Sequence, residues 1–192
     1  NPYRARELGH TVAMDFNYHT TPNRGKLMVL HFIDEASKYH AAKIIREGQC
    51  QNYSGLGNCD ASDLITAIAE WARYFTHPAC FHVDEEGCFH SEQFKEYCGL
   101  KSIEVNMAVG EAHWHNGIVE RHIGTCREML SKLFLEDVFE GVDNKTTVDH
   151  GCESKNRIGF YNGTSPSQWL LGRSRNPLID ASEASPLLTK GS

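Results

Sequence analysis

The stretch TVAMDFNYHTTPNRGKLMVLHFI, residues 11–33, consists of two apolar runs separated by residues that favour turns. Pro22 fixes its own φ, and Asn23 and Gly25 tolerate the positive φ values that a chain reversal requires. Because each flanking run is short and apolar, each has the character of a buried strand. The stretch therefore predicts an antiparallel hairpin with a long turn.

Beyond this hairpin, the sequence pattern predicts further strands and helices. The strands are expected at 39–45, 79–83 and 102–105. The helices are expected at 61–75, 92–98, 116–134, 144–158 and 165–171. Three strands come first, and helices then alternate with strands. This order predicts an α/β fold with a five-stranded mixed sheet flanked by helices.

Single residues mark several of these boundaries. Asp60 and Ser91 can each cap a helix through a side-chain oxygen. Gly99 is expected just past the end of the helix that Ser91 begins, where glycine is favoured. A loop at 107–115 is expected to precede the long helix, which would then begin near Asn116.

The composition is that of an ordinary soluble domain. The chain has 192 residues, of which 40% are apolar and 23% are charged, so one domain with a hydrophobic core is expected. The formal net charge of −6 argues against a nucleic-acid binder that works through bulk positive charge, although a local basic patch is compatible with it. No apolar run approaches the roughly twenty residues that a membrane span needs, so no membrane partner is expected.

The two ends of the chain differ from its middle. Residues 1–8 lack a signal-peptide pattern and an initiator Met, and they are expected to be a linker. Residues 173–192 are expected to be a tail or a second linker. We therefore expect one intracellular domain at 9–172, cut from a longer protein.

The cysteines are typical of a reducing compartment. They are odd in number and no two have CxxC spacing, which favours reduced, buried thiols over a zinc ribbon. His113, His115 and His122 offer a weaker alternative, because an H-x-H pair with a later His could bind Zn²⁺. Trp71 and Trp169 lie at helical spacing and are expected in the core. The cysteines are Cys50, Cys59, Cys80, Cys88, Cys98, Cys126 and Cys152.

Three acidic side chains occupy positions that the predicted fold can bring together. Asp15 is central in the first strand, Asp84 ends the fourth, and Glu120 lies in the first turn of the long helix. An ionised carboxylate in an apolar segment is costly unless it is paired, hydrogen-bonded or bound to metal. If the first and fourth strands are neighbours, the three acids can share divalent cations such as Mg²⁺ or Mn²⁺. Two such ions can activate a nucleophile and stabilise the leaving oxygen in phosphoryl transfer.

Each acid also has an ordinary explanation. An Asp at a strand end is commonly solvated, and Glu120 could simply complement the helix dipole. The chain contains 25 acidic residues, so no one of the three would be informative alone. Only their combination, at successive positions of the fold, favours a metal site.

Several short sequence motifs, called words below, surround these acids in a fixed order. Thirty-five residues, 85–119, separate Asp84 from Glu120. The motif HNGIVER at 115–121 contains Glu120. With these words the chain resembles, from about 9 to 173, the catalytic core of retroviral and LTR-retrotransposon integrases. That family has an Asp, Asp, Glu triad with the same last spacing and an Asn-Gly-x-x-Glu-Arg signature. The other matching words are VAMD at 12–15, FIDEASK at 32–38, FHVD at 81–84, Asn156-Arg157, Ser165-Pro166 and Leu171-Gly172-Arg173.

The resemblance implies an RNase H-like fold and a DNA polynucleotidyl transferase that uses two Mg²⁺ or Mn²⁺ ions. The implied reactions are 3′-end processing by water and strand transfer, in which the DNA 3′-hydroxyl attacks a target phosphodiester. By that analogy Asp15 bridges both ions, Asp84 completes one ion site and Glu120 completes the other. The implied partners are element and target DNA and further copies of the chain, in a homodimer or higher multimer. The implied location is the nucleus if the host is eukaryotic.

One word departs from the family pattern. The glycine after the second Asp usually comes two residues on, whereas Gly87 comes third here, after Glu85 and Glu86. Two extra acids beside the site could repel DNA phosphate, or they could simply face solvent. Together with the net charge of −6, they weaken the expected affinity for DNA more than the expected chemistry.

Four residues near Glu120 are candidates for contacts with DNA. Arg127 lies seven residues later on the same helix face, where a cation can hold phosphate. Asn116 and Gly117 are expected in an active-site loop that positions the DNA end. Arg121 lies about 100° around the helix from Glu120, so it either forms a salt bridge or reaches DNA obliquely. The alternative for both arginines is an exposed, solubilising charge.

Two other functions stay open at this point. The first is a transposase or nuclease of the same fold, against which the Asn-Gly signature and the segment at 165–173 argue. The second is an integrase-derived module that binds DNA or protein without catalysis. The acidic charge favours this second function, and the complete triad argues against it.

Overall fold

A computed structural model of the chain describes residues 7–23, 25–84, 87–107, 113–136, 140–158 and 163–172. In this part of the chain one five-stranded sheet has the strand order β3-β2-β1-β4-β5. Strand β2 is antiparallel to both β1 and β3, while β4 is parallel to β1 and to β5. The predicted mixed sheet is therefore confirmed. The strands are β1 (Thr11–Thr20), β2 (Lys26–Asp34), β3 (His40–Gly48), β4 (Cys80–Val83) and β5 (Glu104–Met107).

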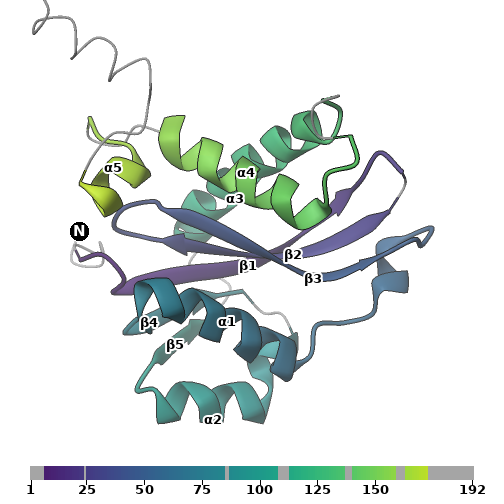
Figure 1. Cartoon of the computed structure of the whole chain (residues 1–192). Helices are drawn as coiled ribbons and strands as arrows, with labels where there is room; N and C mark the ends of the chain where they lie inside the picture. The colour runs from purple at the N-terminus through teal and green to yellow at the C-terminus, as the bar shows by residue number, and fades with distance from the viewer. Residues whose placement is uncertain are drawn as a thin grey trace, which may run out of the picture.

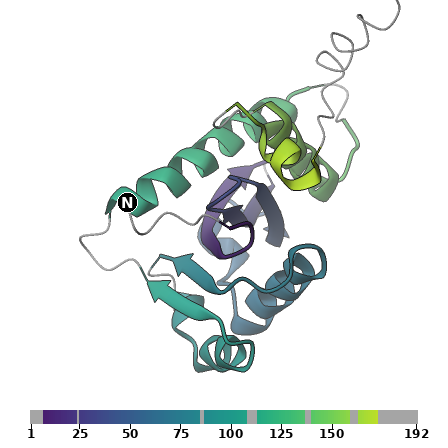
Figure 2. The ribbon, with the colours of Figure 1, turned by 90° about the vertical axis from the view of Figure 1, so that its left-hand side faces the viewer.

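Helices cover both faces of the sheet (Figure 1). Helices α1 and α2 lie below it in that view, and α3 and α4 lie above it. The same three layers are seen along the strands in Figure 2, where α3 extends along one side of the sheet. The helices are α1 (Ala61–Phe75), α2 (Glu92–Leu100), α3 (His113–Leu133), α4 (Asn144–Ile158) and α5 (Pro166–Leu171), with two 3₁₀ turns, η1 (Tyr53–Leu56) and η2 (Gly87–His90).

The helix caps follow local side-chain chemistry. The Asp60 carboxylate accepts the backbone N–H of Asp63, and the Asp63 carboxylate accepts that of Asp60, which is a complete capping box. The Ser91 hydroxyl accepts the N–H of Phe94 at the start of α2. Both predicted caps are confirmed. Since these bonds satisfy helix N–H groups that have no intrahelical partner, they fix where α1 and α2 begin.

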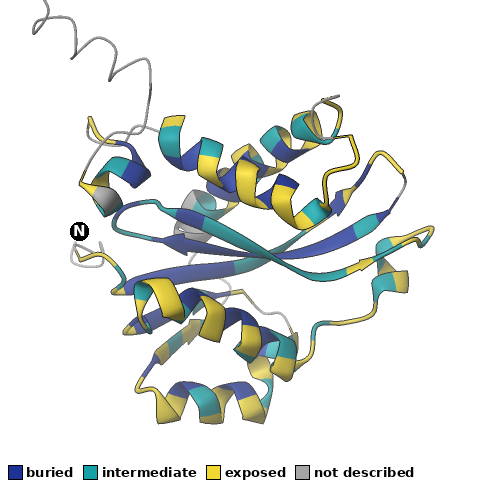
Figure 3. Ribbon diagram, in the orientation of Figure 1, coloured by how far each residue is buried: buried dark blue, intermediate teal, exposed yellow. Residues whose placement is uncertain are grey.

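Alternation along the strands divides the core into two layers. On the α1 and α2 side, Met14 and Phe32 pack with Trp71 and other apolar residues. On the α3 and α4 side, Val29 packs with Leu130 and other apolar residues of both helices. Figure 3 shows the result, with buried strand residues in the middle and exposed residues on the outer helix faces.

Four sequence expectations about boundaries and burial are wrong. Strand β5 begins at Glu104 because Ser102, with φ of 55°, forms a turn. Helix α2 continues through Gly99 to Leu100, since a single glycine weakens a helix without ending it. Trp169 is 46% exposed, because α5 has only six residues and leaves one side of the ring in solvent.

The fourth correction concerns the long helix. Helix α3 begins at His113, not near Asn116. No proline interrupts residues 113–120, so the helix extends further toward the N-terminus than the predicted loop at 107–115 allowed. Glu120 is therefore past the first turn, in a position that is fixed by helical geometry on both sides.

No helix in the described ranges is both long and apolar enough to cross a membrane.

Candidate active site

The strand register brings Asp15 and Asp84 to neighbouring positions. In the parallel pair of β1 and β4, Ala13 lies opposite His82 and Met14 lies opposite Val83. The next position on each chain is Asp15 and Asp84. Met14 and Phe16 pack in the core layer on the α1 and α2 side, so Asp15 between them points to the α3 side of the sheet. Asp15 is half-buried and its Oδ1 accepts the N–H of Phe16 at 2.7 Å, whereas Asp84 is exposed.

Helix α3 carries Glu120 over the same face. Ile123 and Cys126 are buried against the sheet, and Glu120 lies one turn before Ile123 with its side chain exposed. Arg127, two turns after Glu120, is close enough to affect the pKa of His19 on β1.

Helix α3 therefore packs over β1 on one face of the sheet. That Glu120 reaches the two aspartates stays a prediction.

The three carboxylates do not converge on one point. In the described structure their oxygens do not all lie within 4.8 Å of one another. Carboxylate oxygens are the donors that Mg²⁺ and Mn²⁺ prefer, so the donor set fits these ions chemically. In the expected arrangement only Asp15 would bind both ions. Asp84 and Glu120 would bind different ions, so their side chains need not meet.

An imidazole and a carboxylate form an ion pair beside this site. His82 Nδ1 lies 2.5 Å from Glu35 Oε1, and His82 is two residues before Asp84. Hydrogen bonds with Cys80 and Glu35 raise the pKa of His82 to about 10. His82 is therefore a cation at neutral pH, close to the acids. The sequence analysis did not single it out, although the word FHVD contains it.

Asp34, in the word FIDEASK, has a structural role. It is 1% exposed, and its Oδ2 accepts the N–H of Ser37 at 2.7 Å and the Ser37 hydroxyl at 2.6 Å. Its Oδ1 accepts the N–H of Gly9 at 2.8 Å. The carboxylate is thus occupied by the turn between β2 and β3, and it is not available to a metal ion.

The candidate DNA contacts are only partly where we expected them. Arg121 and Arg127 are both exposed on α3, which suits either a DNA contact or a solubilising charge. Asn116 and Gly117 lie within α3, so the expectation that they belong to a loop is wrong. The helix begins before them because nothing in its first turn breaks it. Glu85 and Glu86 lie outside the described residues.

A second polar cluster lies under α3 and α4, and the sequence analysis missed it. His31 and His40 are fully buried, as is the nearby Cys126. The sequence does contain a signal for this cluster, because His31 is a polar residue within the apolar run 27–33. In a strand whose residues are buried on both faces, such a side chain must find a partner.

Burial shifts several groups around this cluster. Desolvation lowers the pKa of His19 to about 4 and that of His122 to about 3, and it lowers the pKa of His40 well below its ordinary value. Desolvation also lowers the pKa of Lys155 to about 8. The Cys152 thiol, through its hydrogen bond to Cys126, lowers the pKa of Cys126 to about 5. The imidazoles of His19, His40 and His122 are therefore neutral at pH 7, whereas the ammonium of Lys155 keeps its charge.

Asn156, in one of the matching words, attaches α4 to the edge strand β3. Its Oδ1 accepts the N–H of His40 at 2.9 Å, and its Nδ2 donates to the His40 carbonyl at 2.8 Å. Replacing Asn156 with Ala is expected to lower the free energy of unfolding by about 2–3 kcal/mol, because two buried backbone groups lose their partners. Urea unfolding measures this change. Asn144→Ala, on the same helix, removes only a solvent-exposed hydrogen bond to Glu47 and should stay within about 1 kcal/mol of the parent.

Comparison with solved structures identifies the fold. The HTLV-2 integrase catalytic core, solved with magnesium in a dimeric form, matches with a TM-score of 0.67 and 16% identity over 86% of this chain and 99% of that chain. The BIV integrase catalytic core matches with a TM-score of 0.62 and 16% identity over 92% of this chain and 99% of that chain. A chain of the simian T-cell lymphotropic virus intasome, solved with the PP2A regulatory subunit B56 gamma, matches with a TM-score of 0.71 and 15% identity. That match covers 91% of this chain and 58% of the other.

No protein-family model and no curated protein matches the sequence. The structural likeness at these identities establishes the fold, so the chain has the RNase H-like fold of retroviral integrase catalytic cores.

Proposed function

We propose that residues 9–172 are the catalytic core of an integrase from a retrovirus or LTR retrotransposon. In this proposal the core catalyses 3′-end processing of element DNA and strand transfer into target DNA. The observation that carries the proposal is the register of β1 with β4, which brings Asp15 and Asp84 to neighbouring positions of an integrase-type fold. A short sequence motif can match the integrase pattern by chance. The register of β1 with β4 is a structural observation that does not depend on the motifs.

The three carboxylates are the proposed ligands of two Mg²⁺ or Mn²⁺ ions. Such ions supply a Lewis acid for the phosphodiester and lower the pKa of a bound water. Asp15 comes from the interior of a central strand, so its position is rigid. Asp84 lies just after a buried strand and Glu120 lies within a helix, so the fold holds all three donors without a flexible loop. The magnesium in the HTLV-2 core structure agrees with this choice of metal.

Positive groups around the carboxylates are the proposed contacts for DNA phosphate. His82 is a cation next to the site because of its partners Cys80 and Glu35. Arg121 and Arg127 extend the positive surface along α3. The acidic net charge of the chain makes this local arrangement necessary, since the molecule as a whole does not attract DNA.

We propose further that the core works with element and target DNA as a homodimer or higher multimer, in the nucleus of a eukaryotic host. The HTLV-2 integrase catalytic core has been solved in a dimeric and a trimeric form, and one related chain belongs to an intasome. Residues 1–8 and 173–192 would then connect the core to other parts of a longer protein.

Mn²⁺-dependent disintegration of a branched oligonucleotide tests this function. This reverse reaction joins DNA with the least help from other domains. Joining that requires metal and disappears in Asp15→Asn is the expected result. A transposase or nuclease of the same fold would cut without joining. A chain that binds neither Mg²⁺ nor Mn²⁺ by calorimetry and joins nothing would be a non-catalytic module.

Substitutions at two glycines of α3 can show whether Gly117 has a functional role or only a structural one. A Cβ at Gly117 or at Gly124 would meet no atom of the described residues within 4 Å. Each glycine-to-alanine change should therefore raise the free energy of unfolding by about 0.5–1 kcal/mol, since alanine is the better helix former. We expect Gly117→Ala to reduce disintegration and Gly124→Ala to leave it unchanged, because only Gly117 lies in the signature before Glu120. Equal activity of the two variants would remove Gly117 from the DNA site.

A further inference from the structure

The cluster under α3 and α4 contains the ligand types of a transition-metal site. Within the described part of the chain, one group of three His, Cys or acidic residues has its ligand atoms all within 4.8 Å of one another, and it is His31, His40 and Cys126. Each member is fully buried and each comes from a different element, β2, β3 and α3. His31 lies directly opposite Asp15 in the pairing of β1 with β2, so this group borders the candidate active site.

A second cysteine stands beside the group. Cys152 on α4 is 5% exposed, and its Sγ lies 3.9 Å from Sγ of Cys126. Two sulfurs that bind one tetrahedral zinc ion are about 3.8 Å apart, given Zn–S bonds of about 2.3 Å. The sulfur pair therefore already has the required separation. Cys152 lies outside the 4.8 Å group, so its sulfur must move toward the imidazoles to complete the site.

The two imidazoles have atoms that the protein leaves unsatisfied. His31 Nδ1 and His40 Nε2 share one hydrogen bond of 2.8 Å. Their other ring nitrogens, His31 Nε2 and His40 Nδ1, have no nitrogen or oxygen partner among the described residues, although the His31 ring also acts on the Cys126 sulfur. The two hydrogen-bonded nitrogens already point at each other, so they are the pair that could share one ion. Each ring would then carry its proton on its other nitrogen.

Metal binding would require a small change in the pair. Two nitrogens on one tetrahedral zinc ion are about 3.3 Å apart, given Zn–N bonds of about 2.0–2.1 Å. The rings would separate by about half an ångström from their hydrogen-bonded distance. The backbone of His40 is held by Asn156 on both its N–H and its carbonyl, so the ring can move while the strand stays in place.

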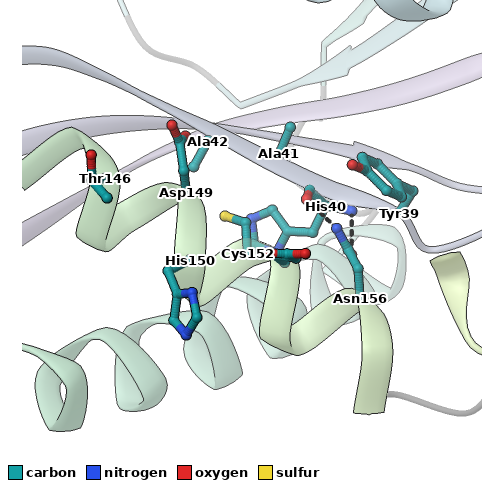
Figure 4. A pocket seen from close by; sticks show the side chains of 10 residues that line it. Tyr39, His40, Ala41, Ala42, Thr146, Asp149, His150, Cys152 and Asn156 are labelled. Atoms are coloured by element: carbon teal, nitrogen blue, oxygen red, sulfur yellow. Dashed lines mark hydrogen bonds between the residues drawn. The ribbon is translucent and has the colours of Figure 1, made fainter. Parts of the chain in front are cut away.

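A hollow gives access to the cluster from the surface. A cavity of about 420 Å³ opens between β3 and α4, and His40 and Cys152 are among the residues that line it. Figure 4 shows both side chains extending into this space. Asp149 and Glu153 also line the hollow, and each has a basic partner on α4. An ion entering here would pass carboxylates before it reached the sulfurs.

We propose that His31, His40, Cys126 and Cys152 bind one structural Zn²⁺ ion in the core of this domain. Imidazole and thiolate together favour zinc over Mg²⁺ or Mn²⁺, which prefer oxygen. Two thiolates balance the charge of the ion. The ammonium of Lys155, which is 4% exposed and acts electrostatically on both sulfurs, would remain as a donor to thiolate.

The site would join four elements that are distant in sequence. Its ligands come from β2, β3, α3 and α4, and they cover residues 31–152. With four protein ligands it has no open position for a substrate, as in other structural zinc sites. Its effect on the active site would be to hold α3, and therefore Glu120, against the sheet.

Cobalt substitution under reducing conditions tests the proposal on the wild-type chain. The chain is treated with a chelator, kept reduced with a phosphine, and titrated with Co²⁺. We expect uptake of one Co²⁺ per chain, with tetrahedral d–d bands and a thiolate-to-metal charge-transfer band that Zn²⁺ removes by displacement. X-ray absorption of the zinc form should give two sulfur ligands at about 2.3 Å and two nitrogen ligands at about 2.0–2.1 Å.

Single-cysteine variants locate the ion. Cys126→Ser and Cys152→Ser should each bind Co²⁺ at least about 100-fold more weakly, since losing even an outer-shell partner commonly costs 10–100-fold. Cys98→Ser is the matched control, because Cys98 is equally buried but belongs to the other layer of the core. It should bind like the parent. Asp84→Asn should also keep the thiolate band, which separates this ion from any at the carboxylates.

Three results would overturn the proposal. The first is a wild-type chain that is folded and reduced but gives no thiolate band with Co²⁺. The second is a band that survives in Cys126→Ser. The third is a Cys126–Cys152 disulfide that forms in air in a chain that binds no Co²⁺ when reduced. The wild-type spectra decide the question even if a variant fails to fold.

Discussion

Replacing Asp84 with Asn is expected to reduce metal-dependent DNA joining by at least about 1,000-fold. The substitution keeps the size of the side chain and removes the negative charge that would hold an ion next to Asp15. A metal ion contributes several kcal/mol of transition-state stabilisation, and each 1.4 kcal/mol is a factor of ten in rate. Because Asp84 is exposed, the change should hardly alter the free energy of unfolding.

The assay is disintegration of a branched oligonucleotide with Mn²⁺, with urea unfolding measured on the same samples. Glu128→Gln is the matched control, because it removes an exposed carboxylate from the same helix that carries Glu120. It should keep the activity of the parent. If Asp84→Asn joined DNA as well as the parent, the triad would be wrong. If it failed to fold, Glu120→Gln on the exposed face of α3 would give the same test.

The parts of the fold that the sequence predicted are those encoded by local pattern. The hairpin at 11–33 follows from two apolar runs and a turn, and α1 follows from a cap at Asp60 and helical spacing. The proposed triad was predictable because the words around each acid carry its position in the fold. The one tertiary contact that the prediction of the triad required was the pairing of β1 with β4.

The His and Cys cluster could not be predicted in this way. His31 and Cys152 are far apart in sequence, and neither has a second ligand at a spacing that a helix or a tight turn would place nearby. Their meeting depends on how α3 and α4 pack on the sheet, which is a tertiary property. The start of α3 was missed for a different reason, since helix ends depend on small free-energy differences over one turn.

Lowering the pH from 7 to 5 in the presence of a chelator is expected to cost about 5–6 kcal/mol of stability. His19 and His122 are each 4% exposed, and desolvation lowers their pKa to about 4 and about 3. Both are neutral in the folded chain, whereas the unfolded chain takes up protons below about pH 6.5. Their contribution is complete above pH 6.5 and is lost as the pH falls toward the folded values. Each contributes a slope of about 1.4 kcal/mol per pH unit, and the shifted His40 adds to it.

Urea unfolding at pH 7, 6 and 5 measures this slope before ordinary carboxylates titrate. His19→Leu should reduce it by about 1.4 kcal/mol per pH unit, since one of the imidazoles is gone. The same variant should be no less stable at pH 7, because it also removes a buried Nε2 that has no partner among the described residues. His90→Asn is the control, since His90 is exposed and its loss should leave the slope unchanged. A stability that stayed level from pH 7 to pH 5 would mean that these imidazoles are not held neutral. The polar layer under α3 would then be open to water, and a closed metal site could not form there.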